Sequence, residues 1–350
     1  MNKWKQQQKS WTKPSIIFFV SLFTVILIVP SLIVVPYGQP KPFAKQSQTI
    51  TSEQPVSIQK NDSPFDITVY RSKQDTVETV PLEEYVVGVV ASEMPTTFEL
   101  EALKAQSLAA RTYIVNLMLS DSKPLGIPAD VDGDVSDNHT FHQVYKNKDE
   151  LAKQWGKNYK SNINKIQKAV NATKGQIITY DGNPIDPSFF STSNGYTENS
   201  EDVWTNNIPY LRSVASPWDE KSPKFKDQKV LTIEDVEKAL GIQLNPNSDN
   251  IGEVKLTETK RVDTIKIGDK EFSGMEVRKA LGLPSNDFEI QQKEENLIFT
   301  IRGYGHGVGM SQYGANGMAK EGKNYKDIVK YYYQGVDITN IEPYTELVMK

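Results

Sequence analysis

The sequence contains no cysteine among its 350 residues. Disulfides and thiolate metal ligands are therefore excluded, and stability has to come from a hydrophobic core. Histidine is scarce, with three in the chain, and an excess of basic charge is absent, because the net charge is −4 at pH 7. This charge balance argues against nucleic acid as a partner.

Charge is also missing from a long apolar run near the N-terminus. Residues 16–35 carry no charged side chain, and about 20 apolar residues suffice to cross a bilayer. Four lysines and no acidic residue lie in residues 1–15, so the positive-inside rule predicts a cytoplasmic N-terminus. A cleaved signal peptide is the alternative, but the run is long for one and no small-x-small site follows closely. We therefore expect a single-pass cell-membrane protein whose folded part is extracytoplasmic.

The remaining chain divides by composition. Residues 36–64 are rich in Pro, Gln, Ser and Lys, which predicts a linker. Residues 65–340 alternate between helical and strand patterns, so we expect one α+β domain of mixed helices and strands, with an inserted subdomain at about 220–295. Helices are expected near 82–90, 100–119, 164–173, 231–240 and 273–281, and strands near 66–70, 176–180, 254–259, 263–267 and 297–302.

Glu93 is the catalytic candidate, because apolar or small residues precede it and Pro95 follows (VVASEMP, 89–95). Burial disfavours an ionised carboxyl, so we expect a raised pKa, as a general acid working near neutral pH requires. A second carboxylate could come from four acidic residues nearby in sequence: Glu83, Glu84, Glu99 and Glu101.

Two cations follow on the predicted helix 100–119. Lys104 and Arg111 are seven positions apart, close to two helical turns, so they share one face. We expect them to orient a substrate or stabilise charge. Salt bridges on that helix face are an equal alternative.

Residues 187–204 are rich in hydroxyl and amide side chains and include the aromatic residues Tyr196 and Trp204. Such groups can hydrogen-bond sugar hydroxyls, while aromatic rings pack on the apolar faces of pyranose rings. A polar turn whose side chains bond their own backbone is an equally good interpretation. A serine nucleophile is disfavoured, because no Gly-x-Ser-x-Gly elbow is present. The candidate binding residues are Ser191, Thr192, Ser193, Asn194 and Tyr196.

Glycines are concentrated in residues 303–309, between a predicted strand and a predicted helix. Glycine permits positive φ and close approach of the backbone to a ligand. The spacing matches neither GxGxxG nor Walker A, so nucleotide binding is not indicated. His306 lies in this turn and is interpreted as a structural or orienting residue rather than an acid or base.

No metal or cofactor is predicted. A calcium-like acidic spacing begins at Asp130, but Phe141 occupies the twelfth position where an EF-hand loop needs glutamate. His139 and His142 are three apart, as two zinc ligands can be, yet no thiol or HExxH partner accompanies them.

Three segments together resemble the stage II sporulation protein D family, also called the amidase-enhancer domain family. They are SEMP (92–95) with EALKAQSLAARTY (101–113), STSNGYTE (191–198), and GYGHGVGMSQ (303–312). The resemblance covers about residues 65–340 and places Glu93 on the family's catalytic glutamate. Gln312, in the third motif, is a further candidate for binding or orienting the substrate. Some relatives bind zinc through cysteines and a histidine near the segment 139–145, and many carry a histidine where Phe190 stands here.

The resemblance implies a lytic transglycosylase that cleaves peptidoglycan glycan strands after an amidase has removed their stem peptides, during septal thinning and engulfment in sporulation. It also implies work beside that partner amidase and a membrane scaffold protein of the engulfment complex. Protonated Glu93 would donate to the glycosidic oxygen between MurNAc and GlcNAc, then accept the proton of the MurNAc C6 hydroxyl as it attacks C1, leaving a 1,6-anhydro end. A hydrolase would use two carboxylates. A non-catalytic glycan-binding activator of a cell-wall amidase and a structural scaffold remain alternatives.

Overall fold

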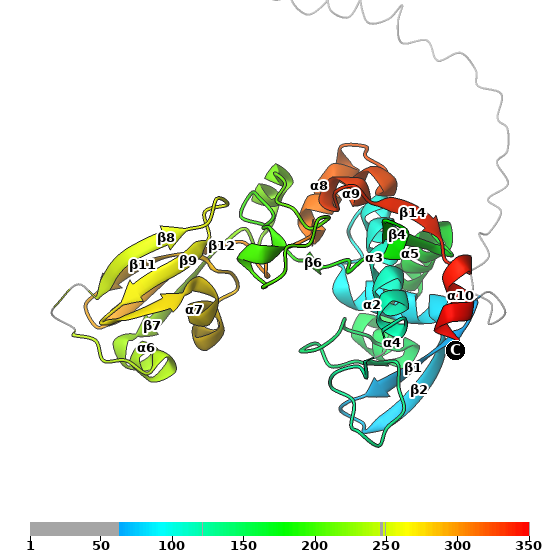
Figure 1. Ribbon diagram of the computed structural model, residues 1–350, viewed down its shortest axis with the longest axis horizontal. Coiled ribbons are helices and arrows are strands. Elements are labelled where there is room, and N and C mark those ends of the chain that lie inside the picture. Colours follow the sequence, from blue (N-terminus) through cyan, green and yellow to red (C-terminus); the bar gives the residue numbers. More distant parts are fainter. Residues whose placement is uncertain (1–62, 121, 246–247, 249, 350) are drawn as a thin grey trace, which may run out of the picture. The chain divides into compact units, whose positions relative to one another are not determined.

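The computed structural model describes residues 63–120, 122–245, 248 and 250–349. Its mixture of helices and strands confirms the α+β class (Figure 1). The transmembrane span predicted at 16–35 and nearly all of the predicted linker lie outside the described residues. Within the described part, no helix has the length and apolar character needed to cross a membrane.

The helices and strands follow one another as mixed elements rather than as repeated units. The helices are α2 (Leu82–Glu93), α3 (Leu100–Met118), α4 (Lys148–Trp155), α5 (Tyr159–Ala172), α6 (Ile233–Leu240), α7 (Gly274–Leu281), α8 (Gln312–Lys320), α9 (Tyr325–Tyr332) and α10 (Glu342–Val348). The strands are β1 (Asp66–Arg71), β2 (Thr76–Pro81), β3 (Val135–Ser136), β4 (Gln176–Tyr180), β5 (Asn183–Pro184), β6 (Phe189–Phe190), β7 (Lys226–Thr232), β8 (Ile251–Leu256), β9 (Val262–Ile267), β10 (Lys270–Ser273), β11 (Asp287–Lys293), β12 (Asn296–Arg302), β13 (Met310–Ser311) and β14 (Asp337–Asn340).

A first apolar core surrounds α3. Helices α2, α5, α8 and α9 all contact α3, as does strand β4 of the β14-β4-β5 sheet (Figure 1). Small residues make this possible, since Ala105 and Ala109 on α3 are fully buried and let neighbouring elements approach closely. The most N-terminal sheet, in the order β2-β1-β3, leads directly into α2.

Helix α2 ends where the chemistry is expected. Pro95 disfavours a helical conformation for the residue before it, and Met94 is indeed extended, with φ −116° and ψ 140°. The next helix begins at Leu100 with Glu99 at its N-cap position and no side-chain cap. Helices α2 and α3 pack against each other, and Glu93 ends the first of them, just before the short connection.

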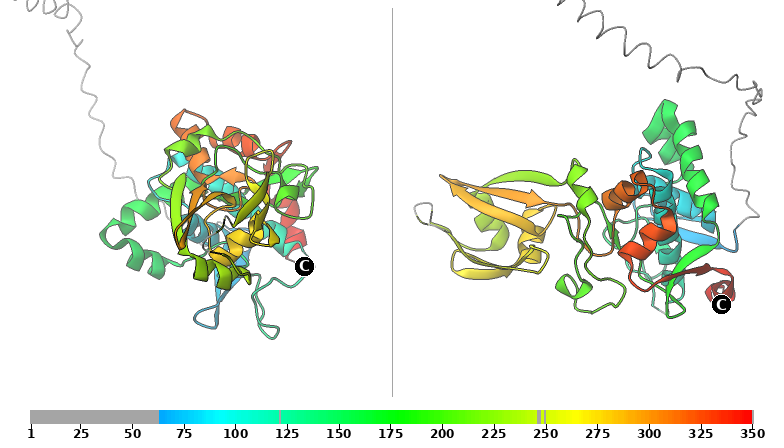
Figure 2. Two further views of the ribbon diagram at one scale, coloured as in Figure 1. Left: turned by 90° about the vertical axis from the view of Figure 1, so that its left-hand side faces the viewer. Right: turned by 90° about the horizontal axis from the view of Figure 1, so that it is seen from above.

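A second apolar core lies within residues 226–302, where the sequence analysis placed an insertion at about 220–295. It contains two three-stranded sheets, β11-β12-β7 and β10-β9-β8, with helices α6 and α7. Strand β12 alternates, so that Leu297, Phe299 and Ile301 are fully buried between half-buried neighbours. Figure 2 shows these strands, coloured yellow-green to orange, from two further directions.

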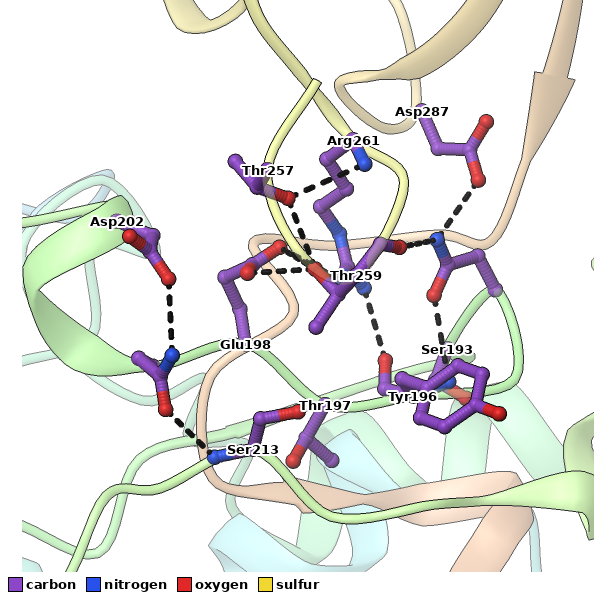
Figure 3. Close-up of polar contacts among 12 residues, drawn as sticks. Ser193, Tyr196, Thr197, Glu198, Asp202, Ser213, Thr257, Thr259, Arg261 and Asp287 are labelled. Carbon is purple, nitrogen blue, oxygen red and sulfur yellow. Dashed lines mark hydrogen bonds and ion pairs between the residues drawn. The ribbon is translucent and has the colours of Figure 1, made fainter.

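A buried polar cluster joins the loop 191–204 to the region of the second core (Figure 3). Arg261 Nη1 lies 2.7 Å from Glu198 Oε2, and the two side chains are 2% and 0% exposed. The Thr259 hydroxyl donates to the same carboxylate. Asn194 donates through Nδ2 to Asp287 Oδ2 at 2.7 Å. These contacts tie the second motif of the sequence to the turn before β9 and to the start of β11.

Candidate active site

Glu93 is the last residue of α2, and its side chain is half-buried. Its Oε1 accepts the Val144 backbone N–H at 2.7 Å. Burial raises the pKa of Glu93, and this effect outweighs the opposing influence of that hydrogen bond and of His139. The partial negative charge at a helix C-terminus also disfavours ionisation. The raised pKa expected from the sequence is confirmed.

Two cavities meet at Glu93. The Trp155 cavity holds about 360 Å³ and is lined by Trp155, Tyr313, Ser191, Lys224 and Gln312 among others. The Tyr113 cavity holds about 280 Å³ and is lined by Tyr113, His142, Asp186, Ser188 and His306 among others. Glu93 is the one described residue that lines both. A chain-like ligand that fills both cavities would therefore have one of its bonds beside this carboxyl.

The Tyr113 cavity contains a hydrogen-bond relay of defined direction. His142 Nε2 lies 2.7 Å from the Leu125 carbonyl oxygen, which can only accept, so Nε2 carries the proton. His142 Nδ1 therefore accepts from the Tyr113 hydroxyl at 2.7 Å. Burial lowers the pKa of His142 and raises that of Tyr113, so both stay neutral. With its proton committed to His142, the Tyr113 oxygen is available as an acceptor to a ligand.

Asp186 is the second carboxyl group of the Tyr113 cavity. Its Oδ1 accepts from the Ser188 hydroxyl at 3.1 Å, and burial raises its pKa. None of the four nearby glutamates proposed from the sequence lines either cavity. Glu83 is buried against Arg111, Glu84 pairs with Lys148, Glu101 pairs with Lys104, and Glu99 is exposed.

His306 lines the Tyr113 cavity with both ring nitrogens already engaged. Nε2 lies 3.0 Å from the Phe189 carbonyl oxygen, and Nδ1 accepts the Val308 N–H at 3.2 Å. Burial, with the nearby Arg278 and Arg261, lowers the pKa of His306 to about 4. A neutral ring with both nitrogens bonded is poorly suited to proton transfer, which favours the structural interpretation.

Two further predicted residues line the Trp155 cavity. Gln312, at the start of α8, donates through Nε2 to the main-chain oxygen of Glu93 at 3.1 Å. Ser191 lies close to it, and its carbonyl oxygen accepts the Tyr313 N–H. The first and third motifs therefore meet at Glu93, while the second motif contributes Ser191.

The other predicted residues of the second motif line neither cavity. The Thr192 and Ser193 hydroxyls are buried against Ser222 and Asp219, at 2.9 Å and 2.7 Å. Asn194 donates to Asp287, as described above. Tyr196 is 46% exposed, and its carbonyl oxygen accepts from Arg261. These side chains make hydrogen bonds within the protein. Most of the second motif therefore supports the structure around the site and does not line its cavities.

Comparisons with known proteins identify the family of this chain. A family model described as stage II sporulation protein matches residues 70–180. The chain is 49% identical to stage II sporulation protein D of Bacillus subtilis (strain 168), over 94% of this chain and 96% of that protein. The chain belongs to the stage II sporulation protein D family. It is also 45% identical to the protein of the same name from Bacillus amyloliquefaciens, over 96% of this chain and 99% of that one. An amidase enhancer of Bacillus subtilis (strain 168) is 29% identical, over 72% of this chain and 40% of that protein.

In this member of the sporulation family, the two predicted cations of α3 form ion pairs. Arg111 is fully buried and bonds both carboxylate oxygens of Glu83, at 3.0 Å and 2.6 Å. Lys104 Nζ lies 2.5 Å from Glu101 Oε1 and over the Tyr325 ring. Neither side chain lines a cavity that Glu93 lines, so the ion-pair alternative describes the positions of both.

The described residues of this family member contain no group of three or more His, Asp or Glu side chains that could hold a metal ion. His142 uses both ring nitrogens in the relay. His139 is exposed and lines the Tyr113 cavity. Sequence reasoning missed Tyr113, Trp155, Tyr313, Asp186 and Lys224. Of these, only the three aromatic residues belong to types that the sugar-binding argument could have selected.

Proposed function

We propose that this sporulation protein is a peptidoglycan lytic transglycosylase. It cleaves the MurNAc–GlcNAc bond of peptide-stripped glycan strands and leaves 1,6-anhydroMurNAc ends, during septal thinning and engulfment. The observation that supports this most is Glu93, a carboxyl with a raised pKa at the one place where the two cavities meet. Aromatic rings in both cavities, Trp155 and Tyr313 in one and Tyr113 in the other, suit pyranose rings on each side of the bond.

The reaction needs one acid that then acts as a base. Protonated Glu93 gives its proton to the glycosidic oxygen as the bond to MurNAc C1 breaks. The Glu93 carboxylate then takes the proton of the MurNAc C6 hydroxyl as that oxygen bonds to C1. No water is consumed, and Glu93 returns to its protonated form. The Val144 N–H stabilises the carboxylate between the two steps.

Asp186 supports hydrolysis as a second candidate. It shares the Tyr113 cavity with Glu93, and glycoside hydrolases use a pair of carboxyl groups on either side of the bond. Hydrolysis adds water to C1, so its product is heavier by one water than the anhydro product.

A non-catalytic glycan-binding activator of a cell-wall amidase is the candidate from another class. The similarity to a protein named amidase enhancer supports it. Such a protein would use the same two cavities without needing a proton from Glu93.

The deciding experiment is mass spectrometry of peptide-free glycan strands after incubation with the full-length chain in detergent. We expect anhydro ends from the wild-type protein and from Glu84→Gln, which makes the same substitution on α2 outside both cavities, and none from Glu93→Gln. Ends that incorporate oxygen from isotopically labelled water would instead establish hydrolysis. Intact strands that co-sediment with all three proteins would establish the activator.

The proposal extends to location and partners. The predicted span 16–35 would anchor the protein in the cell membrane with residues 65–340 in the extracytoplasmic space of the septum. There it would work on glycan strands beside an amidase that strips them and a membrane scaffold protein of the engulfment complex. Protease treatment of intact protoplasts tests the orientation, because an extracytoplasmic domain would be degraded.

A further inference from the structure

Lys224 lines the Trp155 cavity and is the cation there. Its Nζ lies 4.5 Å from the centroid of the Tyr304 ring, and its side chain is exposed. Among the described residues, no carboxylate pairs with this ammonium. Lys224 and Glu93 line the same cavity.

Tyr304 also lines a further cavity of about 450 Å³, together with Arg278 and Lys229. Lys229 Nζ is occupied, because it donates to the Leu281 carbonyl oxygen at 2.7 Å. Arg278 is half-buried and makes no hydrogen bond or ion pair with any described carboxylate. The carboxylate of this cavity, Asp227, accepts the backbone N–H of Gln228 at 2.8 Å.

A partly desolvated guanidinium without an anion is unfavourable, because burial removes water and nothing replaces its hydrogen bonds. Arg261 lies close enough to lower the pKa of Arg278, but its own charge is paired with Glu198. An anionic ligand group between Lys224 and Arg278 would meet two cations whose donors are uncommitted to carboxylates. Tyr304, 47% exposed, lies next to Lys224 and lines a cavity together with Arg278.

Peptidoglycan offers such an anion at a defined moment. Each MurNAc carries a lactyl ether at C3, whose carbonyl group is a neutral amide while the stem peptide is attached. Hydrolysis of that amide adds water, releases the peptide amine and leaves a carboxylate on the sugar. The negative charge therefore exists only on strands from which the peptide has been removed.

We propose that Lys224, which lies over the Tyr304 ring, and Arg278, which lines a cavity with Tyr304, bind the lactyl carboxylate of peptide-stripped MurNAc and so make this protein select such strands. The inference rests on the proposed glycan substrate.

The test measures binding in the Glu93→Gln background, where strands are not cut. Lys224→Met and Arg278→Met, in full-length protein, are compared with Lys330→Met, which removes the same charge on α9 outside the cavities. The ligands are peptide-free strands and the same strands with the lactyl carboxylates capped as methylamides. A charge-assisted hydrogen bond corresponds to about a tenfold change in affinity or more.

We expect Lys224→Met and Arg278→Met each to weaken binding of free-carboxylate strands about tenfold and to leave capped strands unchanged, with Lys330→Met like its parent. The dependence of affinity on salt should fall in the first two variants. Equal losses on both ligands, or no loss on either, would overturn the inference. Because no cleavage is needed, a carboxylate-specific loss without anhydro products from the wild type would reject the transglycosylase and keep the binding site.

Discussion

Replacing Arg111 by methionine distinguishes the two roles considered for this cation. Its guanidinium bonds Glu83 through Nε and Nη2, at 3.0 Å and 2.6 Å, and donates to the Gln176 carbonyl oxygen at 3.1 Å. Both charged side chains are at most 1% exposed. Methionine fills a similar volume, but it leaves the Glu83 carboxylate buried without its partner.

The expected loss of unfolding free energy follows from the isolated charge of Glu83. Breaking a buried ion pair from one side costs about 3–5 kcal/mol, because the remaining ion keeps its desolvation cost. For a protein of this size the melting temperature should fall by on the order of 10 °C. Replacing both partners removes the isolated charge, so Glu83→Met combined with Arg111→Met should recover to within about 1 kcal/mol of the wild type.

Thermal unfolding of the full-length variants, followed by circular dichroism, measures both numbers, and co-sedimentation with peptide-free strands below the melting temperature measures binding. We expect unchanged binding by the folded double variant. A single Arg111→Met variant as stable as the wild type but unable to bind strands would refute the structural role and restore the substrate-orienting one.

Three further outcomes are expected. His139→Asn removes a charge that lowers the pKa of Glu93. The alkaline limb of the pH–rate profile of cleavage, where Glu93 loses its proton, should therefore move to higher pH by less than about one unit. A shift to lower pH would contradict the assignment of Glu93 as the acid. Asp219→Asn removes an acceptor from the Ser193, Ser216 and Ser311 hydroxyls and should cost about 1–3 kcal/mol in thermal unfolding. Because burial raises the pKa of Asp219 in the folded protein, stability contributed by its proton is lost as pH rises through that pKa, and the variant should show a flatter decline. Gly309→Ala would place a Cβ 2.0 Å from the Ser188 carbonyl oxygen, whereas at Gly195, also at positive φ, nothing lies within 4 Å; the first variant should therefore melt well below Gly195→Ala, and equal melting temperatures would show that the turn relaxes.

The elements around Glu93 were predictable because local signals agree there. Apolar spacing without glycine or proline predicts α3, and Pro95 predicts the end of α2. Strands β7 and β11 were missed, and residues 231 and 232 were assigned to a helix. Both strands flank β12 and carry many Lys, Asp, Glu and Gln side chains, so their polar outward faces conceal the strand pattern.

The candidate site was predictable only where one residue's own neighbours decide its environment. The burial of Glu93 is local, and its raised pKa was expected. The partners of Ser193 and Asn194 are Asp219 and Asp287, far along the chain, so their hydroxyl and amide groups suggested sugar contacts that the fold uses internally. Asp186 and Lys224 belong to no sequence motif that indicates a site. Only the tertiary structure shows that they line the cavities.

The Glu198–Arg261 pair constrains how these sequences can diverge. A relative that lost residues 226–302 would lose Arg261 and leave Glu198 buried without a charge partner. The deletion and a substitution at position 198 should therefore occur together. Substitutions at positions 198 and 261 are likewise expected to be correlated among relatives that retain residues 226–302. A chimaera that exchanges this segment between distant relatives should fold when positions 198 and 261 come from the same parent, and should fail to fold when they come from different parents.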